Sequence, residues 1–204
     1  MKHKIVCIGA MLVDELFYCM EQTVPATSNP ATVKRSAGGV MRNIVQHLAL
    51  LNIPASFITI TADDADGQWL REDCRKAGID LGTSFTTATA TGKYAAILNP
   101  DGTLFTAACV NPAESCMTIS LLQQRENLLS DATMIVADTN LSAEVLEWLN
   151  DFCRHNDKLL FIEPVSVLKA KKLQHIALDA VYMITPNEEE LVSLFEDSLT
   201  EAEV

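Results

Sequence analysis

Short apolar runs recur along the chain, and segments with a helical spacing of apolar positions separate most of them. The runs are rich in β-branched residues and predict buried strands at residues 4–9, 55–61, 134–138, 158–164 and 180–185. The 3.6-residue period of an amphipathic helix appears at 39–51, 66–78, 142–155 and 187–195, with a short helix expected near 170–176. Because strands and helices alternate in the second half, the pattern predicts a parallel sheet covered by helices on both faces.

Three segments in the first half do not fit this alternation. Residues 15–19 and 31–36 predict short strands, and residues 92–110 predict a hairpin. The hairpin turns at Asn99-Pro100-Asp101-Gly102, where proline presets φ and glycine accepts a positive φ. These segments predict a small β-sheet appended to the main α/β layer.

The composition is that of an ordinary globular domain. The chain has 204 residues, of which 49% are hydrophobic and 21% charged, enough for one domain with a substantial core. Its net charge of -12 argues against a surface for nucleic acid or for an anionic membrane. We therefore expect a small-molecule ligand or a protein partner, with no nucleic acid and no membrane.

The cysteines and histidines show no disulfide or metal-binding pattern. The six cysteines include no CxxC pair, and the four histidines are scattered without an HExxH motif. No signal peptide is visible, because Asp14 and Glu15 interrupt the first apolar run. No run approaches the roughly 18 apolar residues of a membrane span. We expect a cytoplasmic protein.

Three polar residues stand at the ends of predicted strands. Asp14 follows the first strand, Asn140 follows segment 134–138, and Glu163 ends the run LLFIE. In open α/β sheets, ligands bind beyond the carboxyl ends of the strands. Each residue alone is better explained as part of a loop or a helix cap, but the three together indicate a ligand site.

Two glycines and an asparagine open the first predicted helix. Gly38 and Gly39 stand at its start, although glycine loses the most backbone entropy on ordering. One explanation is a ligand that contacts backbone N–H groups there, with Asn43 bonding a hydroxyl one turn later. The other is a tight strand-to-helix turn followed by a solvated asparagine, and the residues alone support both equally. The segment is not a P-loop, because it lacks the Gly-Lys-Ser/Thr ending.

The segment TPNEEEL, which begins at Thr185, also has two explanations. Thr185 can cap a helix, with Pro186 in the first turn and Glu188 completing a capping box. Alternatively, Asn187 and Glu190 belong to a phosphate and metal site.

Taken together, these segments resemble the ribokinase-like (PfkB) family of carbohydrate and nucleoside kinases. AGGVMRNIVQHLALL is similar to the family's Gly-Gly and Asn signature, TGKYAAILNPDGT to its lid hairpin, and TPNEEEL to its Asn-x-x-Glu motif. The resemblance implies a three-layer α/β/α sandwich with a small β-sheet lid, whose strands fall within about 14–36 and 91–110. Residues 1–204 would then form one incomplete kinase domain that lacks the C-terminal part of the fold.

The resemblance also implies roles for particular residues. Those it assigns to substrate binding are Asp14, Gly38, Gly39, Asn43, Tyr94 and Asn140. Asp14 would accept hydrogen bonds from two ribose hydroxyls, and Tyr94 would face the nucleoside from the lid. Asn187 and Glu190 would organise ATP and Mg²⁺ through water, Glu190 on the metal side, which suits a cation that keeps its hydration.

Within the family, the resemblance is to the pseudouridine kinase branch. The segments SNPATVKRSAGGVMRNIVQHLALL, VADTNLS and EPVS are similar to that branch in order and spacing. The implied reaction is ATP-dependent phosphorylation of the 5′-hydroxyl of pseudouridine, and another sugar or nucleoside kinase of the family is the alternative. A homodimer through the lid is expected, because the hairpin has more apolar surface than one thin sheet can bury.

The chain departs from the family in one respect. The family's Gly-Ala-Gly-Asp segment supplies the catalytic base and an anion hole, whereas Gly102 is the last glycine of this sequence. No catalytic residue is therefore assigned, and we expect this chain on its own to be inactive. A chain that binds a nucleoside without phosphoryl transfer is the alternative from a different functional class.

Overall fold

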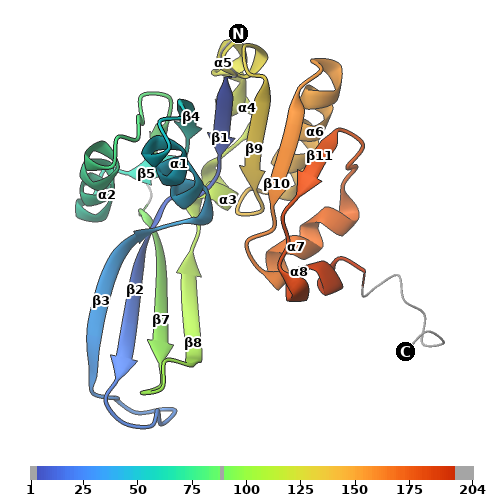
Figure 1. Cartoon of the computed structure of the whole chain (residues 1–204). Helices are drawn as coiled ribbons and strands as arrows, with labels where there is room; N and C mark the ends of the chain where they lie inside the picture. The colour runs from blue at the N-terminus through green and yellow to red at the C-terminus, as the bar shows by residue number, and fades with distance from the viewer. Residues whose placement is uncertain (1–3, 88–89, 196–204) are drawn as a thin grey trace, which may run out of the picture.

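The computed structural model describes residues 4–87 and 90–195. Its largest element is a five-stranded sheet of order β11-β10-β9-β1-β4 (Figure 1). In that order the strands cover Val181–Ile184, Leu159–Glu163, Met134–Asp138, Ile5–Ile8 and Ala55–Ile58. All neighbouring pairs are parallel, so the parallel sheet predicted from the alternation of strands and helices is confirmed.

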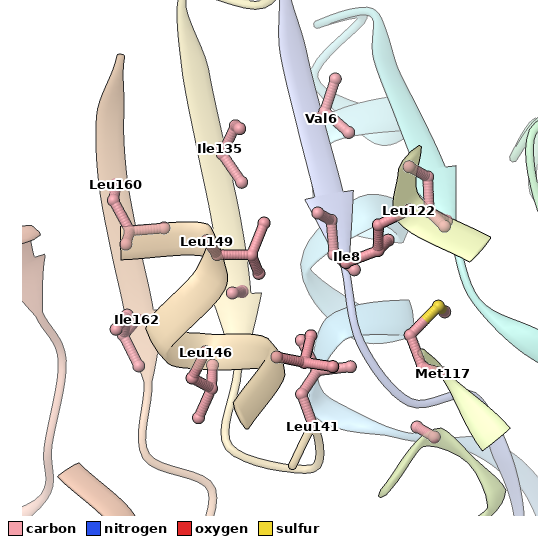
Figure 2. Close-up of a cluster of buried hydrophobic side chains, with 14 of the residues drawn as sticks. Val6, Ile8, Met117, Leu122, Ile135, Leu141, Leu146, Leu149, Leu160 and Ile162 are labelled. Atoms are coloured by element: carbon pink, nitrogen blue, oxygen red, sulfur yellow. The ribbon is translucent and has the colours of Figure 1, made fainter. Parts of the chain in front are cut away.

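Helices cover both faces of this sheet, because its strands direct alternate side chains into two separate cores. Val6 and Ile8 of β1 belong to one core and Cys7 to the other. Figure 2 shows the first core, where Ile135 of β9 lies opposite Leu149. The helices of the first core are α3 (Pro112–Cys116), α4 (Ile119–Gln123), α5 (Glu126–Ser130) and α6 (Ala143–His155). Those of the second are α1 (Val40–Leu50) and α2 (Ala65–Lys76).

A four-stranded sheet, called the lid below, projects from the main layer (Figure 1). Its order is β3-β2-β7-β8, and the strands cover Ala31–Gly38, Leu12–Cys19, Gly92–Leu98 and Leu104–Val110. The β7–β8 hairpin turns where the sequence predicts it, with Gly102 at a φ of 85° and Asn99 N donating to Thr103 O at 2.9 Å. The appended small sheet is thereby confirmed.

Two predictions about the elements were wrong. Segment 55–61 is not one strand, because β4 ends at Ile58 and β5 (Ile60–Ala62) leaves the main sheet to pair with β6 (Phe85–Thr87). The predicted strand 15–19 begins earlier, at Leu12, so Asp14 lies within β2 instead of in a loop. The sequence pattern also missed α3, α4 and α5, because each spans five residues and is too short to show a helical period.

The segment after β10 is less regular than predicted. The short helix expected near 170–176 is a single turn, α7 (Val167–Ala170), followed by the 3₁₀ helix η1 (Lys171–His175). The last described helix is α8 (Glu188–Ser193). Within the described ranges, the structure contains no helix with the length and apolar character needed to cross a bilayer.

Candidate functional site

A pocket of about 430 Å³ opens between the lid, the start of α1 and the loops that follow β9 and β10. Five residues that the sequence predicts for substrate binding line it together: Asp14, Gly39, Asn43, Tyr94 and Asn140. They come from segments far apart along the chain, so their meeting is a product of the fold. The remaining predicted positions lie outside the pocket lining.

The lid presents one row of polar side chains to the pocket. Asp14 of β2 pairs in register with Tyr94 of β7, and Tyr94 pairs with Cys109 of β8. Residues at paired positions share a face of a sheet, so a carboxylate, a phenol and a thiol stand side by side. Partial burial raises the pKa of Asp14, and the nearby positive charge of Arg42 opposes the rise.

The two glycines before α1 make space for other parts of the protein. A Cβ at Gly38 would overlap the carboxylate of Asp14, which lies against the Gly38 backbone. Gly39 caps α1 at a φ of 97°, and a Cβ there would overlap the carbonyl oxygen of Ala10. The fold itself therefore requires both positions to lack a side chain, and the role of these glycines in admitting a ligand stays a prediction. Gly39 still lines the pocket through its backbone, and Gly38 supports Asp14 from outside it.

A buried arginine of α1 orients Asn43. Arg42 is 5% exposed, donates to Asn43 Oδ1 at 3.1 Å and to Gln46 Oε1 at 2.7 Å, and forms an ion pair with Asp73. Because the amide oxygen of Asn43 is engaged, its Nδ2 group is the end without a partner in the described part of the chain. Asn43 therefore offers the pocket a hydrogen-bond donor.

A buried carboxylate anchors Asn140 below the pocket. Asp138, at the end of β9, accepts from Ala10 N at 3.2 Å and from both the backbone N and Nδ2 of Asn140 at 3.1 Å. Burial raises the pKa of Asp138 to about 6, and these hydrogen bonds oppose the rise. Asn140 Oδ1 in turn accepts from Lys169 Nζ at 2.6 Å. Asn140 and Lys169 both line the pocket.

The wall between β10 and α7 contains a strained residue. Val165 has a φ of 68°, which a β-branched side chain rarely adopts, and it lines the pocket. Ser166 N donates to Pro164 O at 2.8 Å across it, so Val165 is the centre of a γ-turn with positive φ. Thr139 Oγ1 also donates to Pro164 O, and Val165 N donates to Glu163 Oε1 at 3.3 Å. Glu163 therefore supports this turn and is not in the pocket lining.

Asn187 and Glu190 are not brought to the pocket. They form the capping box of α8, in which Glu190 N donates to Asn187 Oδ1 at 2.8 Å and Asn187 N donates to Glu190 Oε2 at 3.0 Å. The box predicted from Thr185 to Glu188 was misplaced by two residues. Thr185 Oγ1 instead donates to Glu163 Oε2 at 2.5 Å.

Metal ligands do not gather in the described part of the chain. Across residues 4–87 and 90–195, no three His, Cys, Asp or Glu side chains come together in a way that could hold a metal ion.

Five residues that line the pocket or support its lining were not predicted from the sequence: Arg42, Cys109, Asp138, Ser166 and Lys169. Cys109 could not be found by pairing the hairpin strands outward from the turn, because regular pairing places Ala108 opposite Tyr94. A register shift between Ile97 and Leu98 moves Cys109 to that position. Asp138 had a weak signal, since it ends a predicted strand two residues before Asn140. Ser166 ends the segment EPVS and Arg42 lies within the Gly-Gly and Asn signature, but neither side chain was singled out, because charged or hydroxyl side chains on helices are usually solvated. Lys169 had no signal for the same reason.

Comparisons with known proteins agree with this architecture. The profile described as pfkB family carbohydrate kinase matches residues 2–204. The uncharacterized sugar kinase YeiI of Escherichia coli (strain K12) is 34% identical over 176 residues, covering 86% of this chain and 48% of that protein. The pseudouridine kinase of the same strain is 30% identical over 194 residues, covering 95% and 61%.

A comparison with solved structures also finds a carbohydrate kinase. A carbohydrate kinase from Agrobacterium tumefaciens matches with a TM-score of 0.79 at 28% identity, covering 94% of this chain and 63% of that one. The expected ribokinase-like α/β fold is confirmed. The chain spans about half the length of the first relative, at 48%, and less than two thirds of the other two, at 61% and 63%.

Proposed function

The chain belongs to the pfkB family of carbohydrate kinases, and from this premise we propose that its pocket binds the nucleoside pseudouridine. In the whole kinase, the bound ligand is phosphorylated on its 5′-hydroxyl by ATP. The observation behind the proposal is the convergence of Asp14, Asn43 and Tyr94 on one pocket of suitable size. A volume of about 430 Å³ lies within the range of small-molecule sites.

The lid side of the pocket suits the hydroxyls of a sugar. A carboxylate accepts several hydrogen bonds, so Asp14 can receive the protons of two neighbouring hydroxyls. The Nδ2 group of Asn43 donates to a hydroxyl oxygen, because Arg42 occupies the other end of the amide. An acceptor and a donor at the same edge match a diol, whose oxygen atoms both donate and accept.

Tyr94 extends the site beyond a simple sugar. An aromatic ring beside the sugar-binding row provides a flat apolar face for the planar base of a nucleoside. The pseudouridine kinase of E. coli is 30% identical to this chain, which supports a nucleoside as substrate. Similarity of 34% to a sugar kinase keeps another sugar or nucleoside as the second candidate.

ATP and Mg²⁺ belong to the proposed reaction of the whole kinase. Glu190 is 4% exposed and uses one carboxylate oxygen in the capping box, which leaves the other for a metal-bound water. Mg²⁺ is usually bound through one or two carboxylates together with waters and the substrate phosphates, so Glu190 would contribute to the metal site once ATP is bound. The side-chain oxygen of Asn187 accepts a hydrogen bond in the same capping box. When bound, Mg²⁺ would neutralise charge on the phosphates.

The test is calorimetric binding of pseudouridine to the wild-type chain and to Asp14→Ala. Loss of a charged hydrogen bond lowers the affinity about 10- to 100-fold, with the fold checked by circular dichroism. The matched control is Glu15→Ala, because Glu15 follows Asp14 on β2 and bonds Lys93 at 3.1 Å on the opposite face of the lid. Equal affinity of wild type and Asp14→Ala for pseudouridine would contradict the proposal, and a preference for ribose would favour the second candidate.

A further inference from the structure

The pocket wall opposite the lid contains two polar side chains that can donate hydrogen bonds. Ser166 and Lys169 line it from the segment after β10, beside Val165. The sugar-binding roles proposed above use neither side chain. Both side chains are partly buried, as expected of groups at the edge of a pocket.

The hydroxyl of Ser166 is free to bind a ligand. Ser166 occupies the N-cap position of α7, where serine normally accepts a hydrogen bond from the helix backbone, but it makes no such cap bond. Among residues 4–87 and 90–195, its side chain has no hydrogen-bond partner. A serine in this position without a capping role indicates that its hydroxyl has another use.

The ammonium group of Lys169 is held in place from below. Its Nζ donates to Asn140 Oδ1 at 2.6 Å, and Asn140 is fixed by the buried carboxylate of Asp138. An ammonium has three donor hydrogens, so two remain after this bond. The fixed anchor restrains the flexible lysine stem, which reduces the entropy lost when Lys169 binds a ligand.

The backbone that presents these side chains is strained. Val165 adopts a φ of 68° immediately before Ser166, and such outliers cluster at ligand sites, where the surrounding structure holds them. The hydrogen bonds of Thr139 and Ser166 to Pro164 O fix the turn from both sides. The strain is therefore maintained by specific contacts at the pocket wall.

We propose that Ser166 and Lys169 form a donor pair that binds a carbonyl oxygen on the planar ring of the ligand. This inference rests on the proposed function and specifies the class of nucleoside. The lid side offers an acceptor for hydroxyls, Asp14, whereas the opposite wall offers the Lys169 ammonium, which only donates. A ligand that satisfies both walls has a polyol at one end and a ring carbonyl at the other.

The experiment compares two ribosides that share the sugar and the C-glycosidic bond. Pseudouridine has ring carbonyls, and phenyl C-riboside has none. Affinities are measured by calorimetry for the wild-type chain, Lys169→Met and Ser166→Ala. We expect Lys169→Met to weaken pseudouridine binding about 10- to 100-fold and Ser166→Ala about 2- to 10-fold, with phenyl riboside unchanged.

The control variant is Lys158→Met. It also removes one lysine charge, but Lys158 donates to Ser130 O at 2.6 Å, outside the pocket lining. Its affinity for both ribosides should equal that of the wild type.

The inference is overturned if Lys169→Met loses affinity equally for both ribosides. It is also overturned if both variants bind pseudouridine as tightly as the wild type. Either result leaves the proposed function standing. A wild-type chain that binds neither riboside overturns the proposed function, and the inference falls with it. Because Ser166→Ala removes only an unpaired hydroxyl, it keeps the test valid if Lys169→Met fails to fold.

Discussion

Two carboxylates organise the pocket, and each lies where a glycine has no side chain. Asp14 rests against Gly38, and Asp138 rests against Gly9, where a Cβ would overlap its carboxylate. Asp14 faces the pocket directly, whereas Asp138 acts through Asn140. In the proposed function the two acids would have different tasks: Asp14 would bind the ligand, and Asp138 would position Asn140 and, through it, Lys169.

Asp138 gives the protein a measurable pH dependence. Its pKa in the folded state is about 6, compared with 3.8 ordinarily, because it is buried. The folded state thus binds the proton of Asp138 more tightly than the unfolded state does. Protonation of Asp138 therefore stabilises the folded state at low pH. This stabilisation, at most about 3 kcal/mol, is lost as the pH rises from about 4 to 6. In urea unfolding of wild type and Asp138→Asn, the stability advantage of the wild type should be larger at pH 4 than at pH 7.5.

A constant difference between the two proteins across that range would contradict the prediction. The ionised carboxylate of Asp138 accepts from three donors through two oxygens, whereas Asn has a single acceptor oxygen, so the variant also loses hydrogen bonds at neutral pH. The change of the difference with pH, and not its size at one pH, therefore reports the titration of Asp138.

At the scale of elements, the start of α1 shows how one position serves two purposes. Gly39 turns the chain from β3 into α1 with a positive φ and packs against the Ala10 backbone. The same turn places Asn43 at the pocket. The helix can begin at this point only because residue 39 lacks a side chain.

Gly39→Ala should therefore lower stability strongly. A positive φ costs a non-glycine residue about 1–2 kcal/mol, and the overlap with the Ala10 carbonyl adds about 1–3 kcal/mol. Gly102→Ala is the matched control, because Gly102 also has a positive φ, of 85°, but a Cβ added there would meet no other atom within 4 Å. Chemical denaturation of both variants separates the two costs, and an equal loss of stability would show that the Ala10 contact is unimportant.

At the scale of the whole molecule, the lid exposes much of its surface. Every residue of β8 is exposed, and Val33 of β3 is 60% exposed. The lid face opposite Asp14 has an apolar hollow of about 400 Å³ lined by Phe17, Ala31 and Ile97, among others. A surface of this kind on a thin sheet indicates a protein interface.

We predict that the protein forms a homodimer through this face of the lid. Light scattering should give a dimer mass for the wild type and a monomer mass for Val33→Lys, because a charge next to Phe17 opposes burial. Leu50→Lys should remain dimeric, since Leu50 is 69% exposed at the end of α1, away from the lid. A monomeric wild type at high concentration would refute the lid interface.

The chain of residues 1–204 should bind its ligand without turnover. Phosphoryl transfer depends on stabilising charge at the moving phosphate, and no glycine follows Gly102 to build a cradle for it. Removing a single oxyanion donor costs about 10²–10³ in rate. An assay for ADP release with pseudouridine should stay at background, and turnover that is abolished by Asp14→Ala would contradict this expectation.

The sequence by itself determined the strands of the main sheet and of the lid, the long helices and the family, but not the β5–β6 pair. Hydrophobic periodicity is a property of neighbouring residues, so β9, α6 and the β7–β8 turn could be predicted locally. The motifs likewise located Asp14, Asn43, Tyr94 and Asn140 before any contact was known.

Only the tertiary structure decided what these residues touch. Gly39 makes the tight strand-to-helix turn that its own segment suggested. Its contact with the Ala10 carbonyl, and that of Gly38 with Asp14 on the neighbouring strand, are set by the fold. Arg42 and Lys169 have a defined task only because the fold brings Asn43 and Asn140 to them. A pocket depends on contacts between distant segments, and a pattern of local neighbours contains no information about which distant segments meet.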